Sequence, residues 1–298
     1  MKQSLVIFDG NNVLNRGYHA VPNLKAPNGT PTGAIKGALN IILKNLRDMN
    51  PTHVGAVFDH RSKNFRHKLF PEYKGTRERD PIKEQALAPQ KILMRQLLKA
   101  LGMRVIHKRG YEADDIIGVL AHLGLPTTIV SNDKDFAQLL NKLVKLLRVT
   151  GSGDNREENL ITYKNCEEFI GVPPDKVIEM LMLMGDKVDN IPGVPGVAEI
   201  TAAKLLSAHG SIRGIRLVED TLTPKLRENF AASTAMFKLT RKLATINTTI
   251  IDYDLERLQL QAPDEKEFRA LCRELGLKAL CDNALSSMTA VGKKNKLF

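Results

Sequence analysis

The chain has 298 residues, of which 43% are hydrophobic and 26% charged, and its formal net charge is +11. This composition is that of a soluble globular protein with one large or two modest domains. The first apolar run ends at Asp9, far too early for a signal peptide or a membrane helix, so we expect a cytoplasmic protein of bacterial or phage type. The three cysteines form no C-x-x-C pair, which excludes a disulfide framework and a thiolate zinc site.

Short apolar runs rich in β-branched residues alternate with helical patterns over the first half of the chain. These runs are typical of buried parallel strands, and they predict strands at residues 4–8, 53–58, 103–106 and 127–131. Helical periodicity predicts helices at residues 34–46, 89–101 and 113–123. The alternation indicates an α/β fold with a central, mostly parallel sheet flanked by helices.

The pattern changes after residue 149. A Gly- and Ser-rich stretch predicts a turn at residues 151–155, and one more short strand is expected at residues 160–163. Helical patterns then follow at residues 174–184, 198–209, 235–245 and 264–275. We therefore expect an α/β core at residues 1–164, a helical region at residues 165–290 and a tail at residues 291–298, frayed at residues 293–296.

Most of the excess positive charge lies in one part of the chain. Between His60 and Gly110 there are 14 lysines and arginines against four acidic residues, a local charge of +10. A basic stretch is by default a solvated face. Between two groups of acidic residues, however, an insertion at about residues 60–88 favours a surface that guides a polyanion.

Nine carboxylates come in small groups, most of them at the end of a predicted strand or the start of a predicted helix. They are Asp9, Asp59, Glu112, Asp114, Asp115, Asp133, Asp135, Asp186 and Asp189. The carboxyl ends of parallel strands meet at one edge of a sheet, so the fold should gather these side chains. Gathered like charges require a cation among them, and oxygen ligands without His or Cys suit Mg²⁺ or Mn²⁺. The sequence therefore predicts a metal-dependent phosphoryl-transfer site.

Single members of this set have simpler explanations. Asp133 can be a helix N-cap and Asp9 an Asx turn, while acids at residues 112–115 complement a helix dipole. A strand-end aspartate is also the nucleophile of haloacid-dehalogenase-like phosphatases, but these need an acid two residues later, where this chain has Asn11. These local explanations would have to hold independently for all nine carboxylates. A shared metal site explains the whole set at once.

A glycine-rich turn precedes the predicted helix at residues 198–209. Gly193 and Gly196 would let the backbone pass close to a phosphate, and the helix that follows presents unpaired amides. This is the physics of a helix-hairpin-helix element at about residues 185–209, which holds duplex backbone without reading sequence. A plain loop between helices is the alternative.

These motifs occur in one order along the chain. They read V-I-F-D-G-N-N, A-V-F-D, F-R-H…Y-K-G-T-R, G-Y-E-A-D-D, S-N-D-K-D and M-G-D-K-V-D-N-I-P-G-V-P-G-V. From about Ser4 to about Leu280 the chain resembles the 5′-nuclease (flap endonuclease) family, most closely the 5′→3′ exonuclease domain of bacterial DNA polymerase I. The resemblance implies a PIN-like nuclease core in which all nine carboxylates form a two-metal site.

The resemblance also implies roles for other residues. Lys74 and Arg77 would act catalytically on the scissile phosphate, and with Arg66 and Tyr73 they would belong to a helical arch that engages the 5′ single strand. The implied DNA contacts of the hairpin are Lys187, Gly193, Val194, Gly196, Val197 and Lys204.

Two positions of the hairpin depart from the family pattern. Ala198 replaces a glycine and Ile200 replaces a lysine that would face phosphate. We therefore expect these two substitutions to weaken the binding of DNA at this turn, and the binding of any K⁺ ion that the family holds there.

We expect a Mg²⁺-dependent 5′→3′ exodeoxyribonuclease and flap endonuclease of replication and repair, with two ions per site. No polymerase domain follows, so a free-standing monomer is expected. Its partner is DNA with a 5′ flap, nick or 5′ end, and an RNA primer hybrid and a polymerase or clamp docked at Lys296–Phe298 are further expectations. The alternatives are a catalytically silent protein that binds branched DNA and a small-molecule phosphatase, which would leave the hairpin and the basic insertion unexplained.

Overall fold

The structure is a computed structural model, and it describes residues 2–78, 80–151 and 157–298. The described residues form one six-stranded sheet in the order β3-β2-β1-β4-β5-β6. The strands are β1 (Leu5–Asp9), β2 (His53–Val57), β3 (Arg104–Ile106), β4 (Thr127–Val130), β5 (Val144–Thr150) and β6 (Glu157–Ile161). Neighbours are parallel except for β5 and β6. The mostly parallel α/β sheet is therefore confirmed.

The sequence did not predict β5, and it placed β6 a few residues too late. Charged Lys145 and Arg148 interrupt the apolar run of β5, because this strand lies one place from the edge of the sheet and is partly exposed. The predicted turn at residues 151–155 lies, apart from Gly151, outside the described residues.

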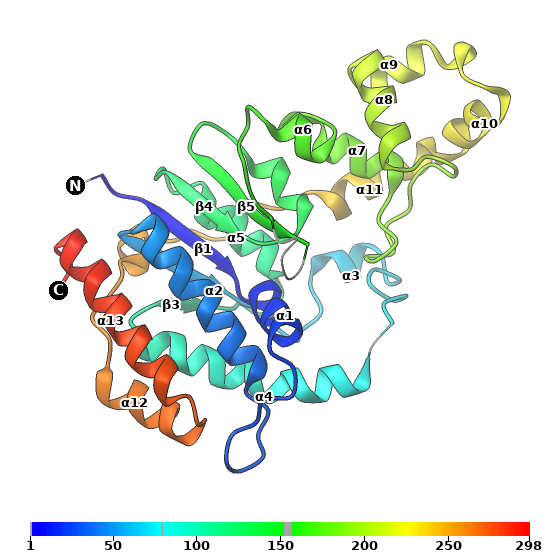
Figure 1. Cartoon of the computed structure of the whole chain (residues 1–298). Helices are drawn as coiled ribbons and strands as arrows, with labels where there is room; N and C mark the ends of the chain where they lie inside the picture. The colour runs from blue at the N-terminus through cyan, green and yellow to red at the C-terminus, as the bar shows by residue number, and fades with distance from the viewer. Residues whose placement is uncertain (1, 79, 152–156) are drawn as a thin grey trace.

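Successive residues of the central strand β1 point into two different cores, as the period of a strand requires. Val6 and Phe8 pack with α2 (Gly33–Met49) and α4 (Pro81–Ala100) on one face of the sheet. Ile7 packs with α5 (Ala113–Ala121) on the other. Figure 1 shows α1 (Gly10–Ala20) and α2 in front of the sheet and α5 behind it. Because both faces are covered, every residue of β1 is buried.

The helix predicted at residues 89–101 begins eight residues earlier, at Pro81. The Asp80 side chain caps it by accepting from the amides of Ile82 and Lys83, at 3.0 and 3.1 Å. Pro89 lies inside this helix, so reading it as the helix start was wrong. The predicted insertion thus contains α3 (Phe65–Leu69), a connection and the first turns of α4.

Helices make up the rest of the chain. They are α6 (Cys166–Ile170), α7 (Val177–Met184), α8 (Glu199–His209), α9 (Ile212–Leu217), α10 (Pro224–Ser233), α11 (Phe237–Ala244), α12 (Glu265–Glu274) and α13 (Lys278–Asn295). Short 3₁₀ helices are η1 (Lys134–Leu139), η3 (Pro174–Lys176), η4 (Glu219–Thr221), η5 (Thr234–Met236) and η6 (Leu255–Leu258). In Figure 1, α8 to α10 project at the upper right, whereas α12 and α13 return to pack beside α4 and α2. The last two helices therefore belong with the core.

The expectation of a tail frayed at residues 293–296 is wrong. Helix α13 continues to Asn295, whose buried side-chain amide donates to the carbonyls of Asn50 (3.2 Å) and Pro51 (2.9 Å). Leu297 packs against the core on that side of the sheet. The polar composition of this segment predicted exposure, whereas Asn295 is buried because its side chain supplies hydrogen bonds to two backbone carbonyls just beyond the end of α2.

Candidate active site

Two adjoining clefts open at the carboxyl edge of the sheet. One, of about 760 Å³, is lined by Asp9, Asp59, Asp114 and Asp133, and the other, of about 870 Å³, by Asp114, Asp133, Asp135, Asp186 and Asp189. Both are also lined by Lys74 and Arg77. Seven of the nine predicted carboxylates thus face one continuous opening. The other two, Glu112 and Asp115, lie beneath it.

Asp9 ends β1 and starts α1. One of its carboxylate oxygens accepts from the amide of Asn12 at 3.0 Å, and the other accepts from the hydroxyl of Ser131 at 2.8 Å. A side chain at Gly10 would meet the Phe58 ring at 2.5 Å, so this sharp exit requires glycine. Burial raises the pKa of Asp9 to about 6, even though both hydrogen bonds lower it.

Asp59 and Asp114 meet where β2 and α5 approach each other. Asp59 accepts from the amide of Ala113 at 2.9 Å, so it stabilises the first turn of α5, and it also accepts from the side chain of Asn11. Asp114 lies in that first turn. Burial, followed by the charges of Asp133 and Asp9, raises the pKa of Asp114 well above its ordinary value.

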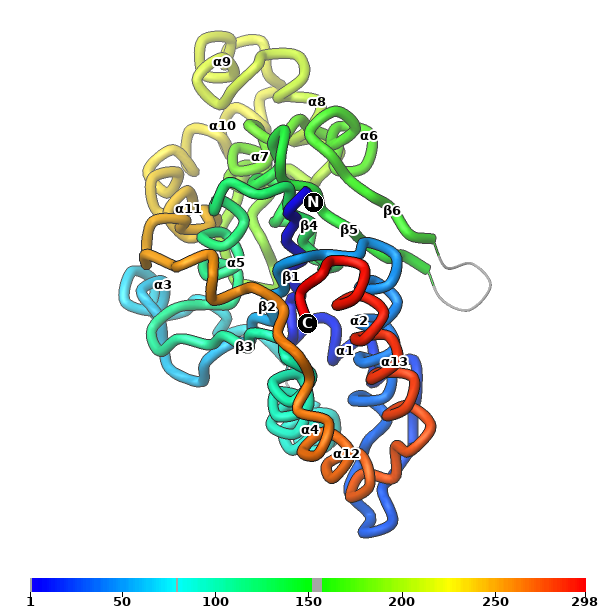
Figure 2. The backbone as a smooth tube through the Cα atoms, turned by 90° about the vertical axis from the view of Figure 1, so that its left-hand side faces the viewer, coloured from blue at the N-terminus to red at the C-terminus, as the bar shows by residue number. Residues whose placement is uncertain are grey.

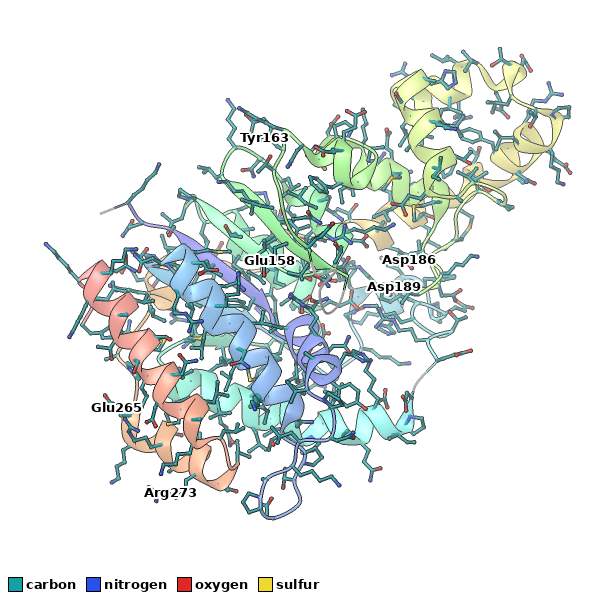
Figure 3. The ribbon with its side chains drawn as sticks, in the orientation of Figure 1. Glu158, Tyr163, Asp186, Asp189, Glu265 and Arg273 are labelled. Carbon is teal, nitrogen blue, oxygen red and sulfur yellow. The ribbon has the colours of Figure 1, made fainter. Side chains whose placement is uncertain are left out.

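The third acidic group follows β4. Asp133 caps η1 by accepting from the amide of Asp135 at 2.9 Å. Burial, followed by the charges of Asp133, Asp186 and Asp189, raises the pKa of Asp135 to about 8. Asp186 accepts from the amides of Val188 (2.7 Å) and Asp189 (3.2 Å), which closes the turn between α7 and α8. Figure 3 shows Asp186 and Asp189 on this loop, to the right of the sheet and above α3.

Asp115 faces the interior and is paired with Arg66. The two Nη atoms of Arg66 donate to the two carboxylate oxygens of Asp115, each at 2.8 Å, and Nε donates to the carbonyl of Leu243 at 2.9 Å. Burial lowers the pKa of Arg66, but the hydrogen bonds and charge of Asp115 outweigh it and raise the pKa. Arg66 is only 2% exposed and its guanidinium is engaged inside the protein, so the structure does not place it on a surface that a 5′ strand could contact.

Tyr73, Lys74 and Arg77 connect the insertion to the acidic cluster. The Tyr73 hydroxyl lies 2.9 Å from carboxylate oxygens of both Glu112 and Asp189, and burial followed by these two charges raises its pKa. Lys74 pairs with Glu112 and lies 3.5 Å from Asp189, which also pairs with Arg77. These cations hold the pKa of Asp189 below its ordinary value despite burial. Tyr73 is 3% exposed, so its predicted place on the strand-binding surface is also corrected.

The hairpin is held mainly by its own backbone. The amide of Val194 donates to the carbonyl of Leu183 at 2.7 Å, and the amide of Val197 donates to the carbonyl of Val194 at 3.0 Å. Both valine side chains are buried in the core. A side chain at Gly193 would meet the Gly185 nitrogen at 2.3 Å, so this glycine is required by internal packing. The amides and side chains of Val194 and Val197 are thus engaged inside the protein, and Gly193 is packed against Gly185. The structure gives no support for a direct contact of these three residues with phosphate.

The remaining hairpin residues lie at the surface. Lys187 and Lys204 are exposed, and Gly196 has a φ of 83°, the left-handed region that favours glycine. Ile200 is 71% exposed at the start of α8, where the family pattern has a lysine. The departures noted in the sequence thus fall on the outer surface of the turn.

The acidic side chains fit a hard cation chemically. Among the described residues, no three acidic, histidine or cysteine side chains lie in positions that could hold a metal ion together without moving. Burial raises the pKa values of Asp9, Asp114, Asp133 and Asp135, and within the same described ranges no lysine or arginine pairs with them. An oxygen-only donor set with uncompensated charge suits Mg²⁺ or Mn²⁺.

Sequence reasoning missed the residues that orient these acids. Ser131 links Asp9 to Asp133, since its hydroxyl donates to the first and accepts from the amide of the second at 3.1 Å. Asn12 accepts from the amide of Asn132 at 3.1 Å and so ties α1 to the end of β4. Ser131 and Asn12 both lie inside motifs given in the sequence analysis. Their position, polar and close in sequence to an acid at a strand end, was the signal that could have identified them.

Known families match nearly the whole chain. The model for the N-terminal resolvase-like domain of 5′-3′ exonucleases matches residues 4–171, and that for their C-terminal SAM fold matches residues 172–266. DNA polymerase I of Caldicellulosiruptor bescii is 36% identical over 287 residues, covering 92% of this chain and 33% of that protein. DNA polymerase I of Bacillus caldotenax is 35% identical over 288 residues, covering 95% and 32%. The chain thus spans about a third of the length of these curated relatives.

Solved structures share the fold. T5 5′-exonuclease with bound zinc ions has a TM-score of 0.66 at 21% identity, covering 97% of this chain and 99% of that one. The catalytic core of Rad2 in complex with DNA substrate has a TM-score of 0.67 at 15% identity, covering 97% and 92%. These likenesses confirm the predicted architecture of an α/β nuclease core with a helical region.

Proposed function

Because the chain belongs to the 5′-3′ exonuclease family, we propose that it hydrolyses phosphodiester bonds of DNA at 5′ ends, nicks and 5′ flaps with divalent metal ions. The observation that carries this proposal is the continuous opening in which seven carboxylates from five segments face Lys74 and Arg77. A small-molecule phosphatase would have no use for cations on an insertion and a hairpin that flank so wide an opening.

The acids divide by role. Asp9, Asp59, Asp114, Asp133 and Asp135 would hold the ions at the sheet, and Asp186 and Asp189 would complete the set from the hairpin. When bound, divalent ions would activate a water molecule and stabilise the leaving oxygen. The raised pKa values of Asp9 and Asp135 mean that these carboxyls release protons when a metal binds near neutral pH.

Lys74 and Arg77 would stabilise negative charge on the scissile phosphate. Both lie at the junction of the clefts, and their partners Glu112 and Asp189 hold them there before substrate arrives. A planar guanidinium suits two phosphate oxygens, whereas an ammonium acts as a point charge. An arriving phosphate would therefore bind Lys74 and Arg77 in the positions that their ion pairs already give them.

Glu112 and Asp115 would hold Arg66, Tyr73 and Lys74 in position rather than bind metal. Asp115 is 0% exposed and bound on both oxygens by Arg66, and Glu112 contacts Lys74, Tyr73 and Arg66. Their charges are thus compensated by protein cations, unlike those of the acids in the clefts. This proposal replaces the metal-ligand role that the resemblance implied for these two residues.

The hairpin would hold duplex backbone through Lys187 and Lys204, the exposed cations on either side of the turn. We also propose K⁺ binding in this turn, where two carbonyl oxygens are already engaged by side-chain hydrogen bonds. Those of Pro192 and Pro195 accept from Thr240 (3.0 Å) and Asn229 (2.8 Å). Replacing K⁺ by tetramethylammonium at constant ionic strength should weaken duplex binding if the ion is held.

Finer points of the function extend the same proposal. Magnesium is proposed as the physiological ion because the donors are all carboxylate oxygens. A monomer in the cytoplasm, action on RNA-primed hybrids and a polymerase or clamp partner are proposed on the relationship to DNA polymerase I alone. No helix in the described part of the chain is both long and apolar enough to cross a membrane.

Cleavage of labelled nicked, 5′-flapped and RNA-primed duplexes, with Mg²⁺ against EDTA, tests the proposal. We expect Mg²⁺-dependent cuts next to the 5′ junction with the parent chain and with the exposed control Asp175→Asn, and none with Asp133→Asn. Tight binding without cleavage in Mg²⁺ or Mn²⁺ would identify a silent structure-binding protein. Hydrolysis of small phosphate esters without DNA cleavage would identify a phosphatase.

A further inference from the structure

The second half of α4 carries a stripe of positive charge. Lys91, Arg95 and Lys99 follow one another at four-residue steps, so they lie on one face of the helix, while Met94 and Leu97 are buried on the other. At 1.5 Å per residue the stripe is about 12 Å long. It lies outside the two clefts, so none of the roles assigned above uses it.

Two histidines lie beside this stripe. His60 follows the end of β2 and His107 follows the end of β3, and their rings stack with centroids 6.1 Å apart at an interplanar angle of 25°. Figure 2 shows α4 directly below β3, and the two elements pack together. Burial, followed by the charges of Arg95 and His60, lowers the pKa of His107. The histidines and the stripe therefore belong to one electrostatic environment.

The stripe is not neutralised from within the protein. In the described ranges, Arg61, Lys91, Arg95 and Lys99 have no carboxylate within ion-pair distance, in contrast to the paired Arg66. Like charges four residues apart destabilise a helix. Three positively charged side chains in a row on one face, without an acidic residue between them, therefore favour the binding of an anionic ligand.

The stripe starts at the acidic edge and leads away from the hairpin. Burial and the charges of Arg95 and Arg61 lower the pKa of Lys91, while the charges of Asp59 and Asp9 oppose that change. Lys91 therefore lies near Arg61 and beside the first cleft. In Figure 1 the hairpin and α8 lie at the upper right, whereas α4 runs below the sheet toward α12. A strand whose duplex lay on the hairpin and whose scissile phosphate lay in the clefts would continue along α4.

We propose that Lys91, Arg95 and Lys99, with Arg61 beside them, bind the backbone phosphates of the single strand on the 5′ side of the cleavage point. This inference rests on the proposed nuclease function for the direction of the strand. A length of about 12 Å matches three or four phosphates at the 3.4 Å rise of a stacked strand. A line of cations suits a chain of phosphates, whereas a single terminal phosphate needs donors that converge on one point.

Equilibrium binding in EDTA tests this without cleavage. The probes are one labelled duplex with a nick and the same duplex with 5′ flaps of two, four and eight nucleotides. The variant is Arg95→Gln with Lys99→Gln, and the matched control is Lys293→Gln with Lys294→Gln on α13, where both lysines are exposed. Lys91 stays unchanged because it lies beside the acidic cluster.

We expect the variant to bind the eight-nucleotide flap on the order of tenfold more weakly than the parent, with nick binding unchanged. Its salt slope on the long flap should fall by about 1.4, the value for two single-strand phosphate contacts. The control should match the parent on every probe, and unfolding curves should show that all three chains are folded.

Three outcomes would overturn the inference. Equal losses on nick and flap would show a general electrostatic effect, and no loss on the long flap would show that the stripe contacts no strand. A loss seen only with 5′-phosphorylated flaps would assign the stripe to the terminal phosphate. If the flap-length effect appears but the parent chain cleaves nothing with Mg²⁺, the proposed nuclease function fails, while binding of the 5′ flap by the stripe stands.

Discussion

Arg66 and Asp115 form a buried bidentate ion pair between α3 and α5, with side chains that are 3% and 0% exposed. The pair also fixes the segment after α11, because Arg66 donates to the carbonyl of Thr245 at 2.8 Å and Asp115 accepts from the amide of Asn247 at 2.9 Å. Three segments that are distant in sequence meet at these two residues. One of them leads into Tyr73 and Lys74, so the pair supports the position of Lys74, for which a catalytic role is proposed.

Asp115→Asn should destabilise the fold by about 3–5 kcal/mol, the usual cost of breaking one side of a buried ion pair. Urea unfolding of the metal-free chain measures this loss. Glu228→Gln is the matched control, because Glu228 pairs with Lys225 in full exposure and its loss should leave stability unchanged within error. A variant as stable as the parent that has lost Mg²⁺-dependent cleavage would instead make Asp115 a metal ligand.

Asp135→Asn should have the opposite effect on stability. The charges of Asp133, Asp186 and Asp189 repel Asp135, so removing its charge should raise the melting temperature of the metal-free chain at pH 8. Stabilisation by Mg²⁺ should shrink, and cleavage should fall by at least about 100-fold, the scale for one electrostatic group of an active site. Thermal melts with and without Mg²⁺ provide the first readout. An unchanged Mg²⁺ response would remove Asp135 from the metal set.

The metal-free chain should lose stability as pH rises from about 4 to 8. The pKa values of Asp9 and Asp135 are raised to about 6 and 8, so the folded chain keeps protons that the unfolded chain releases near pH 3.8. This stabilisation is complete below pH 3.8 and disappears as pH passes through 6 and 8. Asp189, whose pKa is lowered, acts only below pH 4. Burial lowers the pKa values of His53, His67 and His107, so their opposite contribution ends by about pH 6.5 and leaves the loss of stability between pH 6.5 and 8 unopposed.

Melting temperatures in EDTA at pH 5, 6.5 and 8 check this dependence. Mg²⁺ should restore more stability at pH 8 than at pH 5, because the metal competes with protons for the same oxygens. A metal-free melting temperature that is flat or rises over this range would contradict the uncompensated cluster.

Lys74→Ala should lower the turnover of a 5′-flap substrate by about 10²- to 10³-fold while changing its affinity only slightly. The reason is that Lys74 lies at the junction of the clefts, where the proposed mechanism places the scissile phosphate. Single-turnover cleavage and equilibrium binding separate the two effects, with exposed Lys68→Ala on α3 as control. A loss of affinity alone would make Lys74 a steering charge.

The sequence by itself determined strands β1 to β4 and the acids that follow β1, β2 and β4. A parallel strand buried on both faces must be an apolar run, and a turn into a helix favours an N-cap, so β1 with Asp9 and η1 with Asp133 are local patterns. The glycine-rich turn was equally visible. Parallel topology then placed these acids at one edge, without knowledge of any distant contact.

Only the tertiary structure decided which acids face the clefts. Asp114 and Asp115 are neighbours in one helical turn, yet one lines both clefts and the other pairs with Arg66, 49 residues earlier. The burial of Tyr73 and the anchoring of Asn295 depend in the same way on distant partners. Local spacing limits which face of a helix a side chain can occupy. Which charge or core that face meets is set by packing between distant segments, because a buried charge is stable only where the fold supplies its counterion.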